Sequence, residues 1–165
     1  MLTGMAEWSR GGSVDCYIDA TPEAIYAVVS DVTSTGDRSP ECKAADWLPG
    51  HEPGTVGARF RGRNRVGRII RWSRACEVLV AEPGREFAFR TVPERFDPSR
   101  SDSTIWRYRL EPEGTGTRVT QSYEVTVMPA AIFVALYGRL LPHHRDMRPQ
   151  MSETLENLKR SIESA

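Results

Sequence analysis

An arginine on an otherwise apolar strand face is the first residue of this chain whose type and position suggest chemistry. Strand alternation gives one face to Ile70, Trp72, Arg74, Cys76, Val78 and Val80. A charge on such a face needs a partner or a bound anion, so Arg74 could hold a carboxylate, a phosphate or an enolate oxygen. The alternative is that Arg74 lies near a rim of the sheet or bends outward.

Two tyrosines on later strands could work beside that arginine. Tyr108 and Tyr123 face inward by the same alternation, and either phenol could pass a proton during loss of water. Arg74 would stabilise the enolate oxygen in such a reaction, which makes these three residues the candidate catalytic set. Each tyrosine could equally be a core residue whose hydroxyl binds a nearby carbonyl.

Two adjacent histidines form a second candidate, near the end of the chain. If the helical phase continues past Pro142, His144 lies on the same side as Met147 and Met151. An imidazole there could act as a general base or contact a ligand. No cysteine or carboxylate falls at metal-ligand spacing beside His143 and His144, so we predict no metal site. The alternative places both histidines at a bend between two helical segments.

The elements that must position these residues follow an α+β pattern. A strand at 14–19 precedes an amphipathic helix at 23–31, for which Thr21 is a plausible N-cap and Pro22 suits the first turn. Period-two alternation predicts further strands at 44–48, 58–65, 68–81, 86–92, 103–111 and 117–127. Their short connections predict antiparallel neighbours. The longer, charged stretch 93–102 is typical of a mobile loop at one rim.

The chain closes with helical patterns. Residues 132–140 begin a helix that Pro142 should break, and an apolar ladder then runs through Met147, Met151, Leu155, Leu158 and Ile162. Pro149 lies inside this last stretch and is expected to bend it. A sheet curled around a closing helix tends to leave a hollow between the layers. We assign residues 1–12 to a flexible N-terminus and residues 13–165 to a single domain.

The residues expected to face this hollow are mostly aromatic, with a few polar groups among them. Such a lining suits a flat or branched apolar ligand whose oxygens are oriented by amides and phenols. The predicted ligand-binding residues are Phe60, Asn64, Trp72, Arg74, Phe89, Trp106, Tyr108, Gln121, Tyr123, His144, Met147 and Met151.

Composition argues against several classes of partner. The 165 residues carry 22 basic and 22 acidic side chains, so no net field steers nucleic acid or an anionic membrane to the protein. The arginines of 59–65 alternate away from Phe60, which favours a solvated face over a nucleic-acid surface. No apolar run is long enough to span a membrane.

The same composition gives an expected cellular location. The first residues lack a secretion pattern, and three cysteines without close pairing fit a reducing cytosol, so we expect a cytoplasmic protein. Whether the chain forms a homodimer is left open.

Four stretches carry a resemblance to a known superfamily. They are Ile18–Tyr26 after the first strand, Gly57–Arg65 within the sheet, Glu82–Arg85 at a turn and Thr154–Lys159 near the end. Over about residues 13–162 the chain resembles the START-like (SRPBCC) helix-grip superfamily, in its polyketide cyclase/dehydrase and lipid-transport branch. The resemblance implies a seven-stranded antiparallel sheet gripping the last helix, with an apolar cavity between them. It assigns no catalytic residue.

Three functions remain open on this basis. The first is a protein that binds a small hydrophobic molecule such as a polyketide, lipid or isoprenoid. The second is a polyketide cyclase or dehydratase that gains its rate from orientation and uses no cofactor. The third is an interaction domain of the chaperone-cofactor type, for which a filled interior is expected. Nucleotide-binding glycine loops and hydrolase signatures are absent from the sequence.

Overall fold

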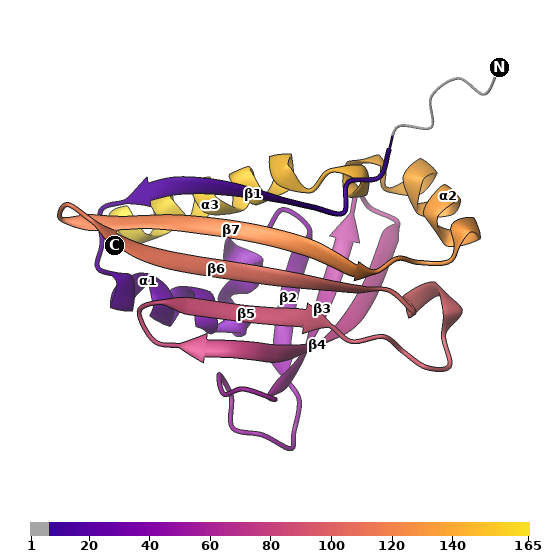
Figure 1. Cartoon of the computed structure of the whole chain (residues 1–165), viewed down its shortest axis with the longest axis horizontal. Coiled ribbons are helices and arrows are strands. Elements are labelled where there is room, and N and C mark those ends of the chain that lie inside the picture. The colour runs from indigo at the N-terminus through magenta and orange to yellow at the C-terminus, as the bar shows by residue number, and fades with distance from the viewer. Residues whose placement is uncertain (1–6) are drawn as a thin grey trace.

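The computed structural model describes residues 7–165 as one sheet with helices packed against it (Figure 1). The strands are β1 (Gly11–Ile18), β2 (Cys42–Trp47), β3 (Arg59–Val66), β4 (Ile70–Glu82), β5 (Glu86–Thr91), β6 (Ser103–Glu113) and β7 (Gly116–Val127). The α-helices are α1 (Pro22–Ser30), α2 (Ala131–Leu140) and α3 (Arg148–Glu163). Short 3-10 helices are η1 (Val32–Asp37), η2 (Pro98–Arg100) and η3 (Pro142–Arg145).

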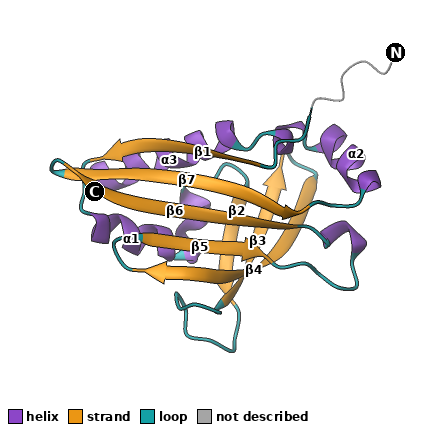
Figure 2. Ribbon diagram, in the orientation of Figure 1, coloured by secondary structure: helices purple, strands orange, loops and turns teal. Residues whose placement is uncertain are grey.

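The strands form a seven-stranded sheet in the order β1-β7-β6-β5-β4-β3-β2, with every neighbouring pair antiparallel. This confirms the predicted architecture. Strands β2 to β7 pair in sequence order as a meander, while β1 pairs with β7, the strand farthest from it in the sequence. In Figures 1 and 2, β2 and β3 run across the direction of β5, β6 and β7, so the sheet curls. Helix α3 lies behind the β1–β7 side of that curl.

Helix α1 forms where the sequence predicts it. The backbone N–H of Ala24 donates to Oγ1 of Thr21 at 3.3 Å, and Pro22 occupies the first turn, where no N–H is needed. Ile25 and Val29 are fully buried and belong to the hydrophobic core. The helix therefore fills one end of the hollow beneath the sheet.

Pro149 lies in the first turn of the last helix and not inside it, which corrects the sequence-based expectation of a bend. Helix α3 starts at Arg148 with Met147 as its N-cap residue, so Pro149 lies in the first turn, where a missing N–H costs no hydrogen bond. Leu155 and Leu158 are buried against the sheet. Helix α3 is consequently anchored at its middle, and its N-terminal turn lies beside the cavity described below.

A β-bulge changes which side chains of β4 face inward. The register passes from Val78 opposite Phe89 to Val80 opposite Ala88, which leaves Leu79 as the extra residue. Ala81 then pairs with Phe87 and packs against the core. The prediction that Val80 continues the inward face was therefore wrong, because a bulge shifts the alternation by one residue and leaves no mark in hydrophobicity.

The first strand begins earlier than the alternation predicted. β1 begins at Gly11, three residues before the predicted start, and the backbone N–H of Ser9 donates to the carbonyl of Arg145 at 2.8 Å. Of the N-terminus predicted to be flexible, residues 1–6 lie outside the described residues. Among residues 7–165, no helix has the length and apolar character that a membrane span requires.

The arginines of β3 lie on the outer face of the sheet, as the alternation predicted. Arg59 donates to Glu77 on β4 at 2.8 Å, and Arg63 donates to Asp46 on β2. Phe60, between them in sequence, is buried on the other face. Two arginines of this run are thus paired with carboxylates of neighbouring strands.

Candidate functional site

A cavity of about 480 Å³ lies under the curled sheet, and α2, η3 and α3 contribute to its wall. This volume is within the range of roughly 300–1,000 Å³ that is common for small-molecule sites. All the residues predicted to bind a ligand line it, from Phe60 on β3 to Met151 on α3. Their contact with a ligand stays a prediction.

Aromatic rings form much of the wall. Trp106 and Tyr123 stack with ring centroids 5.7 Å apart, and Phe60 meets Phe89 edge-to-face at 5.1 Å. Aromatic pairs of this kind bury large apolar areas in preferred relative orientations. The cavity therefore offers a preformed apolar surface.

Arg74 already has the partner that a buried charge requires. Its Nη1 donates to the carboxylate of Asp102 at 2.8 Å, and its Nη2 donates to the backbone carbonyl of the same residue at 2.9 Å. The side chain is only 12% exposed, and its Nε is buried without a hydrogen-bond partner among the described residues. Arg74 thus lines the cavity while Asp102 compensates its charge.

The two candidate tyrosines differ in their hydrogen bonds. Nε2 of Gln121 donates to the hydroxyl of Tyr108 at 3.1 Å. The hydroxyl of Tyr123 and Oε1 of Gln121 are buried, and neither has a partner among residues 7–165. Neither tyrosine binds the carbonyl that the core alternative expected. Because the Tyr123 hydroxyl is enclosed, neighbouring side chains must move before a ligand reaches it.

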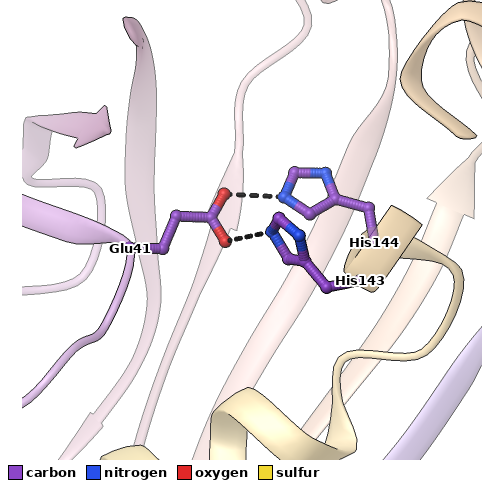
Figure 3. Close-up of side chains that lie close together, drawn as sticks. All are labelled: Glu41, His143 and His144. Atoms are coloured by element: carbon purple, nitrogen blue, oxygen red, sulfur yellow. Dashed lines mark hydrogen bonds and ion pairs between the residues drawn. The ribbon is translucent and has the colours of Figure 1, made fainter. Parts of the chain in front are cut away.

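The structure places a carboxylate, that of Glu41, beside the two histidines (Figure 3). The sequence did not reveal this carboxylate. Oε2 of Glu41 lies 3.2 Å from Nε2 of His143, and Oε1 lies 2.6 Å from Nε2 of His144. Burial alone would raise the pKa of Glu41, but the hydrogen bonds and charges of the two histidines outweigh it and hold this pKa at about 2. Glu41 is therefore ionised at neutral pH. Both histidines lie in η3, at the bend that the alternative anticipated.

Two cysteines border the cavity without being nucleophiles. Burial raises the pKa of Cys42, and it raises that of Cys76 to about 12 although the charge of Arg74 opposes the shift. Both thiols are accordingly neutral at physiological pH. Since the thiolate is the reactive form, covalent catalysis by either cysteine is disfavoured.

Arg38 is a cavity residue that sequence reasoning missed. It is 4% exposed and donates to neutral oxygens only, among them Oγ of Ser34 at 2.8 Å and Oγ1 of Thr35 at 3.4 Å. Among the described residues no carboxylate forms an ion pair with it. It lies in the turn-rich stretch after α1, where no periodicity indicates which side chains are buried. A buried cation at the cavity favours a ligand that carries an acceptor oxygen.

Solved structures share this fold over nearly the whole chain. A polyketide-cyclase-like protein of Corynebacterium glutamicum is 32% identical, with a TM-score of 0.60, and the match covers 94% of this chain and 92% of that one. A protein of Thermus thermophilus is 20% identical with a TM-score of 0.66, over 93% and 97% of the two chains. The di-domain ARO/CYC StfQ from the steffimycin biosynthetic pathway is 11% identical with a TM-score of 0.68, and 94% of this chain matches 51% of StfQ.

Sequence comparison gives the family. No curated protein matches the sequence. The family described as polyketide cyclase / dehydrase and lipid transport matches residues 13–163, which include every strand from β2 to β7 and all three α-helices. The chain belongs to the polyketide cyclase / dehydrase and lipid transport family.

Proposed function

We propose that the protein binds a small hydrophobic molecule of polyketide, lipid or isoprenoid type in the cavity beneath the sheet. The observation that carries this proposal is the cavity of about 480 Å³ with its stacked aromatic wall. Each Å² of apolar ligand surface removed from water there contributes about 25 cal/mol. The family and the fold relatives support the same class of ligand.

The polar groups of the cavity favour a ligand with at least one oxygen. Arg38 is buried with neutral acceptors only, so an added carbonyl or carboxylate oxygen would improve its electrostatic surroundings. The side-chain amide oxygen of Gln121 has no hydrogen-bond partner among the described residues. It could accept a hydrogen bond from a ligand hydroxyl if the side chain turned toward the ligand. An oxygenated apolar molecule therefore fits better than a pure hydrocarbon.

Extraction of the purified protein tests the proposal. Protein isolated from its native cells is denatured, extracted with organic solvent and analysed by mass spectrometry, and thermal shifts are measured with a panel of lipids and polyphenols. We expect a co-purifying apolar molecule and a stabilising shift with at least one panel member. No extracted molecule together with a flat panel would end the proposal.

A pair of variants on α3 locates the binding. Thr154 is buried and lines the cavity, while Ser152 is exposed on the same helix. Thr154→Phe should occupy part of the cavity and reduce both the extracted molecule and the thermal shift, whereas Ser152→Phe should leave both unchanged. Equal effects of the two variants would place binding elsewhere.

A second function, a cyclase or dehydratase acting on a poly-β-ketone, is supported by the family. A pocket that folds such a chain gains rate by holding an enolate carbon against a carbonyl. Two observations rank it behind simple binding: Asp102 compensates the charge of Arg74, and the Tyr123 hydroxyl is enclosed. Turnover of a synthetic poly-β-ketone should fall in Arg74→Ala and Tyr108→Phe, and unchanged turnover in both removes this assignment.

The third alternative, an interaction domain of the chaperone-cofactor type, was expected to have a filled interior. A cavity of about 480 Å³ gives that alternative no support.

A further inference from the structure

We infer that Glu41, His143 and His144 form a binding site for a divalent transition-metal cation, best matched by Zn²⁺, at the edge of the cavity. This inference goes beyond ligand binding by the cavity and replaces the sequence-based expectation of no metal site. That expectation depended on spacing along the chain, whereas Glu41 lies 102 positions from His143.

The ligand atoms already lie close to the separations that a metal requires. One carboxylate oxygen and one ring nitrogen from each histidine all lie within 4.8 Å of one another. Ligand atoms about 2.0–2.1 Å from Zn²⁺ are about 3.3 Å apart in a tetrahedron. The 3.2 Å between Oε2 of Glu41 and Nε2 of His143 is close to this value, whereas the 2.6 Å between Oε1 of Glu41 and Nε2 of His144 is shorter. The carboxylate must therefore rotate and move away from His144 before one of its oxygens can bind a metal together with both nitrogens.

Both sides of the site are held by backbone hydrogen bonds. The carbonyl of Glu41 accepts from the N–H of Arg65 on β3 at 3.0 Å, which fixes the residue at the edge of the sheet. The N–H of His144 donates to the carbonyl of Leu141 at 2.9 Å, within the turn that forms η3. In Figure 3 the two imidazoles project from η3 toward the same carboxylate. A site supported in this way loses little entropy when a metal binds.

The chemistry of the ligand set selects the class of cation. Two imidazoles and one carboxylate suit Zn²⁺ and its neighbours in the first transition row, whereas Mg²⁺ and Ca²⁺ prefer oxygen ligands throughout. Glu41 is the acidic ligand of the set, and its side chain is only 11% exposed. That burial lowers the local dielectric and strengthens its attraction for a cation.

Three protein ligands leave at least one coordination position for another group. Glu41 and His144 both line the cavity, so a cation bound to them lies at the cavity wall. Water or an oxygen of a bound molecule could fill the remaining position, which is the arrangement of open zinc sites. The ring of Trp72 packs against the imidazole of His144 in a T-shaped arrangement, with the ring centroids 5.7 Å apart.

Titration of the tag-free protein with Zn²⁺ and Co²⁺ tests the inference. The protein is stripped with chelator and titrated with Zn²⁺ by calorimetry and with Co²⁺ by visible absorption at neutral pH. We expect one ion per chain and the intense Co²⁺ bands of tetrahedral coordination. In Glu41→Gln, His143→Gln and His144→Gln, binding should weaken by more than about 100-fold, because loss of even an outer-shell partner costs about 10- to 100-fold.

The third histidine of the chain is the matched control. His51 is exposed and lies outside the cavity lining, so His51→Gln should bind both ions like the wild type. If the cluster variants do not fold, nuclear magnetic resonance of the wild type during Zn²⁺ titration still tests the inference. Zn²⁺ should shift the ring resonances of two histidines, and the third, identified by its loss in His51→Gln, should stay in place.

Several results would overturn the inference. They are a wild type that takes up no stoichiometric Zn²⁺ or Co²⁺, folded cluster variants that bind as the wild type does, and ring shifts confined to His51. Any of them would leave the cluster as an ion pair between η3 and the edge of the sheet.

Discussion

The unequal hydrogen bonding of the two cavity tyrosines predicts opposite effects of the same substitution. Tyr123→Phe removes a buried hydroxyl that has no partner among the described residues, and it keeps the ring that stacks on Trp106. Tyr108→Phe removes the acceptor of Nε2 of Gln121 and leaves that amide buried without any bond. The first change should stabilise the fold and the second should destabilise it.

The magnitudes follow from the cost of burying polar groups. An unpaired buried polar group costs about 1–3 kcal/mol, so Tyr123→Phe should raise the free energy of unfolding by about 1 kcal/mol. Tyr108→Phe loses one net hydrogen bond and creates an unpaired amide, so it should lower the free energy of unfolding by about 2 kcal/mol. For a chain of this length, each kcal/mol corresponds to about 2–4 °C in Tm.

Urea denaturation of the ligand-free protein, followed by tryptophan fluorescence and circular dichroism, measures both changes. The double variant Tyr108→Phe/Gln121→Leu is the control for the amide, because replacing both partners by apolar groups removes the unpaired donor. It should recover most of the stability lost in Tyr108→Phe. Cooperative curves with unchanged slopes are needed for the comparison.

The reasoning is refuted if Tyr123→Phe lowers the free energy of unfolding by as much as Tyr108→Phe does. That result would mean that the Tyr123 hydroxyl has a partner, such as a bound water, that outweighs its burial. Failure of the double variant to recover stability would separately refute the role assigned to Gln121.

Further predictions concern the charges and thiols around the cavity. Asp102→Asn should cost about 2 kcal/mol in urea denaturation because it leaves the charge of Arg74 with a neutral partner, and no loss would mean that this pair contributes nothing net. Cys76, whose pKa burial raises to about 12, should resist iodoacetamide at pH 8 in the folded protein and react after denaturation, and rapid labelling of the folded form would contradict its burial. Burial alone would raise the pKa of Glu77, but the hydrogen bonds and charges of Arg59 and Arg90 together outweigh it and lower this pKa below the unfolded value of 4.5. Its contribution to stability is thus present above pH 4.5 and lost as the pH falls below it. The free energies of unfolding of wild type and Glu77→Gln should therefore differ at pH 7 and become equal in acid. A difference that does not change with pH would contradict this sign.

The fold was largely predictable because its signals are local. Alternation, turn residues and the Thr21–Pro22 helix start each identify an element without reference to the rest of the chain. The sequence-based predictions were wrong where one extra residue in a strand reverses which side chains face inward, or where the effect of a proline depends on its exact position in a helix. The bulge at Leu79 moved Val80 off the inner face, and Pro149 proved to lie in the first turn of α3.

The site was predictable only where strand alternation determines it. Inward residues such as Trp72 and Trp106 line the cavity because their strands are regular there. Arg38 and Glu41 were missed because they lie between η1 and β2, where no period orders the side chains. The contact between Glu41 and His143 depends on how two distant segments of the chain pack together, and the spacing of residues along the sequence does not predict that packing.

The pairing of β1 with β7 also determines when during synthesis the protein can fold. Its first strand has no neighbour until residues 116–127 leave the ribosome, and α3 emerges later still. Until then the nascent chain exposes the apolar face that will become the cavity wall, and contacts between distant parts of the sequence make folding slow. Nascent chains that stall before this point should therefore be targets for chaperones and proteases.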